Sequence, residues 1–317
     1  MKNYQIIDDV PQTPMVSVAV LAYNHENYIS QAIEGILMQK TDYSFKITIA
    51  EDCSTDSTRQ ILLKYQEQYP EKIKLLLQNK NVGAQQNNFD VLSNLDGKYI
   101  ATCEGDDYWT DPLKLQKQVD FLEKNEEYGL VHTNYKNYYA KSKTFKVHQP
   151  FIKCSRADEN LYYIETGDMR TCTVMFRSKF IGPIKNLLAQ PFMKDGVLGD
   201  RPIFLLITKL SKLHFIDAVT SVYHITDKNS ASHFSNIFNY YTFLHKTAVI
   251  NFEALKYLGY DKKHFIIYKK KMAYFQIFLM MNKGFRTFSL LVMSYFFRYG
   301  LTTKDLREIA GVYRTTR

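Results

Sequence analysis

The sequence predicts an α/β fold in which helices flank a mostly parallel sheet, with a helical extension at the C-terminal end. Short apolar runs alternate with segments of helical periodicity over the first 125 residues. Polar or glycine-containing turns separate them. From about Ser235 onward the pattern is helical and aromatic. With 317 residues, 45% of them hydrophobic, the chain can bury a large core.

The first half of the chain predicts four strand and helix units. The expected strands are residues 16–21, 45–50, 73–77 and 99–102. The helices expected after them are residues 28–38, about 55–69, 84–95 and 113–124. Ser54 or Thr55 is expected to cap the second of these helices. Alternation at this spacing indicates βαβ units, whose ligands gather at the carboxyl ends of parallel strands.

The second half is less regular. Strands are expected at residues 129–134, 171–177 and 213–223, and helices at residues 181–188 and 200–210. The tyrosine-rich residues 135–145 fit either a strand or a loop. We expect one main domain over residues 1–230 and a basic, aromatic helical extension over residues 231–317.

An acidic cluster follows the fourth strand. Glu104, Asp106 and Asp107 lie within four positions. Like charges so close together at the end of a buried strand are costly unless a cation lies among them. Hard oxygen ligands without histidine favour Mg²⁺ or Mn²⁺. The alternative is a solvated acidic turn.

The acidic cluster is the last of an ordered series of motifs. The series is Ala22-Tyr23-Asn24, then Glu51-Asp52 with Ser54-Thr55-Asp56, then Asn81-Val82-Gly83, then Glu104 to Trp109 with Thr110-Asp111-Pro112. In order and spacing over residues 15–125 it resembles the family 2 glycosyltransferases, which are inverting enzymes of the Rossmann-like GT-A fold. The match is to the bacterial branch with a Glu-Gly-Asp-Asp-Tyr-Trp signature. The resemblance implies a donor-binding part at about 15–125 and an acceptor part at about 126–230.

The resemblance also implies roles for individual residues in binding a nucleotide-sugar donor. Tyr23 would stack on the base, Glu51 and Asp52 would accept hydrogen bonds from base and ribose, and Asp106 would be the first metal contact. Glu104 and Asp107 would assist the metal or contact the sugar. Further expected donor-site residues are Glu26, Asn81 and Gly83.

Several of these residues have a purely structural alternative. Tyr23 fits a core or edge aromatic, since the chain has 24 tyrosines. Asn81 and Gly83 fit a turn with positive φ. Trp109, the only tryptophan, fits either core packing or an aromatic platform for the acceptor.

The general base implied by the resemblance is a carboxylate at the start of a helix. Asp200, before Arg201 and Pro202, is the candidate, with Asp195 as the fallback. Asp200 also fits a simple N-cap. Many relatives continue with Tyr-Arg-x-His, but Thr226 stands here in place of the final His. His224, Lys228 or the metal alone would take over that role, unless His224 is a solvent-facing strand residue.

The resulting expectation is a metal-dependent, hexosyltransferase-type inverting enzyme of bacterial surface polysaccharide or glycolipid assembly. The donor would be a nucleotide-diphosphate sugar, with a UDP-sugar favoured, and the acceptor a carbohydrate or lipid-linked saccharide. A nucleotide-sugar binding protein without transferase activity, or a nucleotidyltransferase, is the alternative. The latter would need a phosphate-cradling glycine-rich loop after the first strand, which residues 22–27 do not offer.

Charge and cysteine content set the remaining expectations. The net charge is +9, but residues 237–317 alone contain 14 Lys or Arg and 4 Asp or Glu, so the basicity belongs to the tail. Without a recognition motif, nucleic-acid binding is not expected. Basic aromatic helices suit either peripheral membrane contact or packing on the core. The polar residues 1–14 and four cysteines without metal-ligand spacing favour a cytoplasmic protein with reduced thiols. Membrane contact would place it peripherally at the inner face of the membrane.

Overall fold

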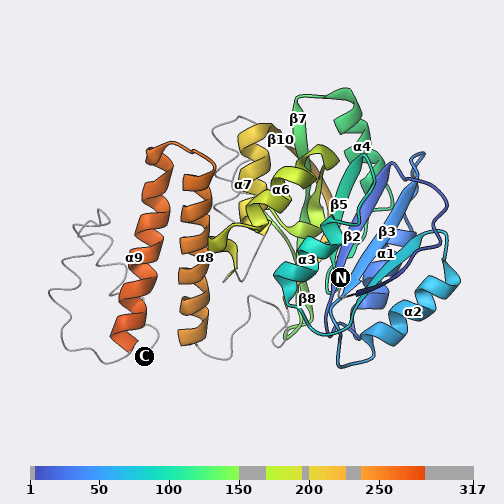
Figure 1. Ribbon diagram of the computed structural model, residues 1–317, viewed down its shortest axis with the longest axis horizontal. Helices are drawn as coiled ribbons and strands as arrows, with labels where there is room; N and C mark the ends of the chain where they lie inside the picture. Colours follow the sequence, from blue (N-terminus) through green and yellow to red (C-terminus); the bar gives the residue numbers. More distant parts are fainter. Residues whose placement is uncertain (1–3, 150–168, 195–199, 226–236, 283–317) are drawn as a thin grey trace. The chain divides into compact units, whose positions relative to one another are not determined.

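The computed structural model describes residues 4–149, 169–194, 200–225 and 237–282 (Figure 1). The chain divides into two compact units. The larger unit comprises Met1–Ala189 and Ile203–Asn229, and the smaller one comprises Gln190–Pro202 and Ser230–Arg317. The expected sheet lies in the larger unit.

A ten-stranded mixed sheet forms the centre of the larger unit, in the order β1-β4-β3-β2-β5-β9-β7-β10-β6, with β8 paired to β7. The strands are β1 (Tyr4–Ile7), β2 (Val16–Ala22), β3 (Phe45–Glu51), β4 (Ile73–Gln78), β5 (Tyr99–Glu104), β6 (Tyr108–Trp109), β7 (Tyr128–Tyr139), β8 (Thr144–Val147), β9 (Val174–Arg177) and β10 (Lys212–Ile225). The neighbours β4, β3, β2 and β5 are parallel, as are β7 and β10. The prediction of a mostly parallel sheet flanked by helices is confirmed.

The helices of the larger unit follow the predicted alternation. They are α1 (Ile29–Leu37), α2 (Thr58–Gln68), α3 (Ala84–Leu92), α4 (Lys114–Lys124), α6 (Ile181–Leu188) and most of α7 (Asp200–Leu210), with short 3₁₀ turns η1 (Thr171–Thr173) and η2 (Ser178–Phe180). Apolar faces of α1, α2 and α4 join the inner strands in one core, because Ile33, Leu62 and Val119 are fully buried there. Burial of these side chains holds the strand ends in place.

The register of the parallel strands brings three motifs to one edge of the sheet. Ala22 at the end of β2 pairs with Glu51 at the end of β3. On the other side of β2, Leu21 pairs with Glu104 at the end of β5. The loops that follow the three strands therefore start at the same level, which is where a parallel sheet presents its ligand-binding loops.

One capping prediction is wrong. Helix α2 begins at Thr58, and its N-cap residue, Ser57, makes no side-chain cap bond. Ser54 and Thr55 instead bond to Asn24 in the loop after β2: the Asn24 N–H donates to Ser54 Oγ over 3.0 Å, and the Thr55 N–H donates to Asn24 Oδ1 over 2.8 Å. These polar side chains tie two loops together rather than starting a helix.

The structure defines two further segments of the second half. The tyrosine-rich stretch, left open between strand and loop, is the end of β7 and a hairpin to β8, with Tyr138 opposite Phe145. The segment expected as a strand at 171–177 begins with the 3₁₀ turn η1 before β9. Since Thr173 Oγ1 donates to the carbonyl of Arg170 over 2.7 Å, a local side-chain bond competes with the strand there.

The smaller unit contains two long helices, α8 (Ile237–Tyr257) and α9 (Phe265–Asn282), which run side by side in Figure 1. The 3₁₀ turns η3 (Pro191–Met193) and η4 (Lys262–His264) also belong to it. Among the described residues, no helix combines the length and apolarity needed to cross a bilayer. The apolar run at 287–297 lies outside the described residues.

Candidate active site

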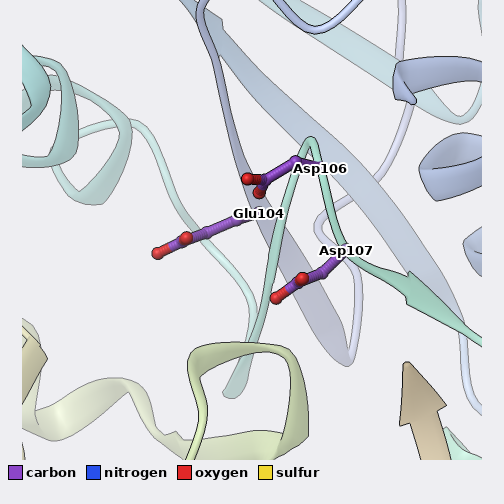
Figure 2. A group of neighbouring side chains, drawn as sticks. All are labelled: Glu104, Asp106 and Asp107. Atoms are coloured by element: carbon purple, nitrogen blue, oxygen red, sulfur yellow. The ribbon is translucent and has the colours of Figure 1, made fainter. Parts of the chain in front are cut away.

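The candidate active site is built on the acidic turn, which we define as residues 104–107 between β5 and β6. The Asp107 N–H donates to the Glu104 carbonyl over 3.0 Å, and the Gly105 N–H donates to the Leu21 carbonyl of β2 over 2.9 Å. Figure 2 shows the side chains of Glu104, Asp106 and Asp107 projecting from one side of this turn. One carboxylate oxygen from each lies within 4.8 Å of the others.

Asp107 is the most buried member of the acidic turn, with 1% of its surface exposed. Its Oδ1 accepts the main-chain N–H of His224 over 2.9 Å. Its Oδ2 is buried without an N–H or O–H partner among the described residues, although the Cys172 thiol lies beside the carboxyl. Burial raises the pKa of Asp107 well above its usual range, and the charges of Asp106 and Glu104 raise it further.

The acidic turn fits a divalent cation. Its donors are hard carboxylate oxygens, which Mg²⁺ and Mn²⁺ prefer. A buried carboxylate oxygen without an N–H or O–H donor among the described residues, such as Asp107 Oδ2, is costly and would be satisfied by a cation. The structure thus brings together the three acidic residues that the sequence analysis placed around a metal.

His224, near the end of β10, is far from the acidic turn in the sequence but lies against it in the fold. The residue is 6% exposed, and its Nδ1 contacts the Asp106 carbonyl oxygen. The rings of Tyr28, Tyr108 and Tyr138 surround it with centroid distances of 5.2, 5.4 and 5.0 Å. The alternative of a solvent-facing strand residue is therefore wrong.

Glu51, at the end of β3, is fully buried and ion-paired with Arg59 of α2, with Nε and Oε2 2.5 Å apart. Its Oε1 accepts the Ser54 N–H over 2.5 Å. Arg59 also donates to the Gln78 carbonyl at the end of β4 over 2.6 Å. Sequence reasoning missed Arg59, although an arginine eight residues after a buried acid, on the following helix, is a recognisable signal.

Asp52 holds the loop that follows β4. Its Oδ1 and Oδ2 accept the N–H groups of Val82 and Gly83 over 2.7 and 3.0 Å. Asn81 Oδ1 accepts the same Gly83 N–H over 3.1 Å, and Gly83 has a φ of 83°. Burial raises the pKa of Asp52, while the two main-chain donors oppose that shift. Asp52, Asn81 and Gly83 thus form one unit beside Glu51.

The loop after β2 presents Tyr23 outward, with 40% of its surface exposed, so the core alternative for this ring does not hold. Glu26, three residues on, is exposed and accepts the Ser57 N–H over 3.0 Å through Oε2. His25 between them donates its main-chain N–H to Thr58 Oγ1 over 2.8 Å. The exposed Tyr23 ring is available for stacking.

Trp109 belongs to the core beneath the site. It is 1% exposed and donates its indole N–H to the Cys172 carbonyl over 2.9 Å, which rules out the platform alternative.

The Lys114 ammonium lies 4.7 Å from the Trp109 ring centroid. Burial lowers the pKa of Lys114 to about 7. Burial also raises the pKa of the free thiols Cys103 and Cys172, which argues against reactive thiolates.

The candidate base, Asp200, is the first residue of α7, where its Oδ1 accepts the Arg201 N–H over 2.8 Å. Asp200 belongs to the smaller unit and the acidic turn to the larger one, so its catalytic role stays a prediction. Asp195, Thr226 and Lys228 lie outside the described residues.

Comparison with known proteins identifies the class of this fold. The mixed sheet, in which the parallel strands β2, β3 and β5 end at one edge, is the GT-A fold of glycosyltransferases. Residues 17–182 match the family described as Glycosyl transferase family 2. The match covers more than half of the chain, and the chain therefore belongs to that family.

Two curated relatives illustrate the likeness. An uncharacterized protein of Mycobacterium tuberculosis is 45% identical over 112 residues, which are 35% of this chain and 32% of that protein. The UDP-Glc:alpha-D-GlcNAc-diphosphoundecaprenol beta-1,3-glucosyltransferase WfaP of Escherichia coli is 33% identical over 125 residues, 39% of this chain and 46% of WfaP. The matching segments thus span less than half the length of these relatives.

Two solved structures share the fold. S. aureus TarS 1-349 in complex with UDP-GlcNAc has a TM-score of 0.61 at 18% identity, covering 82% of this chain and 71% of the TarS chain. The mannosyltransferase PcManGT from Pyrobaculum calidifontis, in complex with GDP-Man and Mn²⁺, has a TM-score of 0.54 at 14% identity, covering 98% and 87%. At these identities the likeness concerns the fold.

Proposed function

We propose that this chain transfers a hexose from a nucleotide-diphosphate sugar, with a UDP-sugar favoured, to an acceptor hydroxyl with inversion. Mg²⁺ or Mn²⁺ would lie at the acidic turn, with Asp106 as its first protein contact. The observation that carries the proposal is the convergence of the Glu104, Asp106 and Asp107 carboxylates within 4.8 Å. Asp107 Oδ2, which is buried without an N–H or O–H donor among the described residues, also supports it.

The donor would lie across the ends of β2, β3 and β5. Tyr23 is exposed at the first of these ends and would stack on the base. Asp52 holds the turn of Asn81 and Gly83 next to it. The Glu51 carboxylate is already engaged by Arg59, so it would contact base or ribose only as part of that ion pair. Glu26 would complete the rim of the site.

The cation would stabilise the negative charge that develops on the leaving diphosphate. Direct displacement requires a deprotonated acceptor oxygen behind the anomeric carbon, and Asp200 would take that proton. Its carboxylate lies at the first residue of α7, at the positive end of the helix dipole. An Asp200→Asn variant should bind donor normally and lose transfer by about 10²- to 10⁴-fold.

The acceptor class is a carbohydrate or a lipid-linked saccharide, within surface polysaccharide or glycolipid assembly. WfaP, whose name describes glucosyl transfer to a diphosphoundecaprenol-linked sugar, supports the lipid-linked option. The basic residues of the smaller unit, among them Lys262 and Lys263, which are exposed, suit the anionic headgroups near such an acceptor.

The proposal is tested by thermal shift of the full chain with Mn²⁺ and a panel of UDP- and GDP-sugars. A donor at 100 times its Kd adds about 2.7 kcal/mol of stability, which raises the Tm of a chain of this size by about 4 °C. Asp106→Asn should lose this increase. Asp42→Asn, the same chemical change at an exposed position, should keep it. The proposal fails if no nucleotide sugar stabilises the chain, or if Asp106→Asn responds like the unaltered protein.

A further inference from the structure

The position of His224 is set by strand pairing. Strand β10 pairs with β6 in antiparallel register, with Ser221 opposite Trp109 and Val222 opposite Tyr108. Continuing that register by two residues puts His224 opposite Asp106. The end of β10 therefore lies along the acidic turn, 117 positions away from Asp107 in the sequence.

His224 holds the acidic turn through two groups. Its main-chain N–H donates to Asp107 Oδ1 over 2.9 Å, and its Nδ1 contacts the Asp106 carbonyl oxygen. A carbonyl oxygen only accepts hydrogen bonds, so Nδ1 must carry the proton and donate. One residue thereby fixes the backbone at Asp106 and the carboxylate rotamer at Asp107.

Three tyrosines keep the His224 ring in place. Tyr28 precedes α1, Tyr108 lies on β6 and Tyr138 lies on β7, and their ring centroids are 5.0 to 5.4 Å from that of His224. Because the ring is buried among three elements, its donor is ordered before any ligand arrives. Pre-ordered donors of this kind reduce the entropy that binding must overcome.

The opposite side of the turn is closed by His25. A Cβ built on Gly105 would lie 2.6 Å from His25 Nδ1 and 2.9 Å from Ile29 Cδ1. The turn is therefore confined between the loop after β2 and the end of β10. It cannot shift toward His25 to compensate for a lost contact at His224.

We propose that His224 is a positioning residue which holds the acidic turn in the geometry that binds the divalent cation. The proposal rests on the proposed function, because it concerns the same cation site. His224 acts through Asp106 and Asp107, in the way that hydrogen-bond partners of metal ligands orient them.

The test compares Mn²⁺ affinity, from the free-ion EPR signal, in four full-length proteins. His224→Phe keeps the ring but removes Nδ1, and its affinity should fall about 10-fold or more. His224→Asn places an amide N–H near the position of Nδ1 and should restore affinity to within about 3-fold. His214→Phe is the matched control: it lies on the same strand, stacked on Phe121 at 3.9 Å, and should bind like the unaltered chain.

A second measurement does not depend on the metal. Amide hydrogen exchange at residues 104–109 should be faster in His224→Phe than in the unaltered chain and His214→Phe, with Tm reported alongside. Equal Mn²⁺ affinity and equal exchange in His224→Phe overturn the proposal.

If the unaltered chain binds no Mn²⁺, the proposed cation site is wrong, and the exchange data alone decide whether His224 holds the turn. If His224→Phe does not fold, His224→Gln, whose amide lies nearer Nε2, replaces it; affinity equal to that of His224→Asn is then the contradicting result.

Discussion

The main-chain N–H of His224 and the Oδ1 of Asp107 are joined by a 2.9 Å hydrogen bond. This bond satisfies one oxygen of a carboxyl group whose other oxygen, Oδ2, is buried without an N–H or O–H donor among the described residues. Burial of this second oxygen therefore lowers the stability of the metal-free protein.

That loss of stability predicts the behaviour of Asp107→Asn. The pKa of Asp107 is raised in the fold by burial, so the unfolded chain gives up this proton at lower pH than the folded one. The penalty is therefore small at low pH and grows as pH rises above the unfolded pKa. Without metal, Asp107→Asn should be more stable than the unaltered protein by about 2 kcal/mol at pH 7.5, and the difference should shrink at pH 5. Urea unfolding at both pH values measures it, and a constant difference would contradict the explanation.

Gly105→Ala should damage the acidic turn. The added Cβ would lie 2.6 Å from His25 Nδ1 and 3.0 Å from the Leu21 carbonyl oxygen. Since the latter is backbone in a buried strand, relief requires the turn to move, and we expect a loss of about 1–3 kcal/mol together with weaker Mn²⁺ binding. Gly182→Ala in α6 has no atom within 4 Å of the added Cβ and should be neutral or stabilising. Equal melting temperatures for the two variants would count against a confined turn.

Arg59→Met should be strongly destabilising. It leaves the Glu51 carboxylate, which is fully buried, without its cation, and removing one partner of a buried pair costs about 3 kcal/mol. Lys98→Met breaks the ion pair of Lys98 and Glu123, whose side chains are 53% and 33% exposed respectively. The loss of stability should be at most about 1 kcal/mol. Urea unfolding of the two variants measures the loss in the free energy of unfolding of each. Similar losses would contradict a stabilising role for the ion pair of Glu51 and Arg59.

Lys114 predicts a pH dependence of stability. Burial lowers its pKa to about 7 in the fold, so between pH 7 and 8 the unfolded chain binds a proton that the folded chain has lost. Stability therefore rises with pH, by about 1 kcal/mol over this interval. Lys114→Met should remove the rise, whereas Lys117→Met, on the same helix and 40% exposed, should retain it. A rise that survives in Lys114→Met would assign it to another group.

The sequence allowed the sheet and the residues at its strand ends to be predicted, because each depends on local periodicity. Glu104, Asp106 and Asp107 lie at the end of the largely buried strand β5, which pairs with β2, and they do meet. The sequence left two interpretations of His224 open, because its environment depends on β10 pairing with β6. The ion pair of Glu51 was missed for a related reason, since Arg59 reaches the strand end from α2, and local periodicity does not show contacts between separate elements.

Anomalous diffraction from crystals grown with Mn²⁺ and UDP tests the central claim most directly. A cation bound at the acidic turn would give a peak about 2.2 Å from an Asp106 carboxylate oxygen, with the diphosphate of UDP on its open side. Crystals of Asp42→Asn should show the same peak and those of Asp106→Asn should not. UDP bound without a peak at the turn, or a peak that persists in Asp106→Asn, would contradict the account.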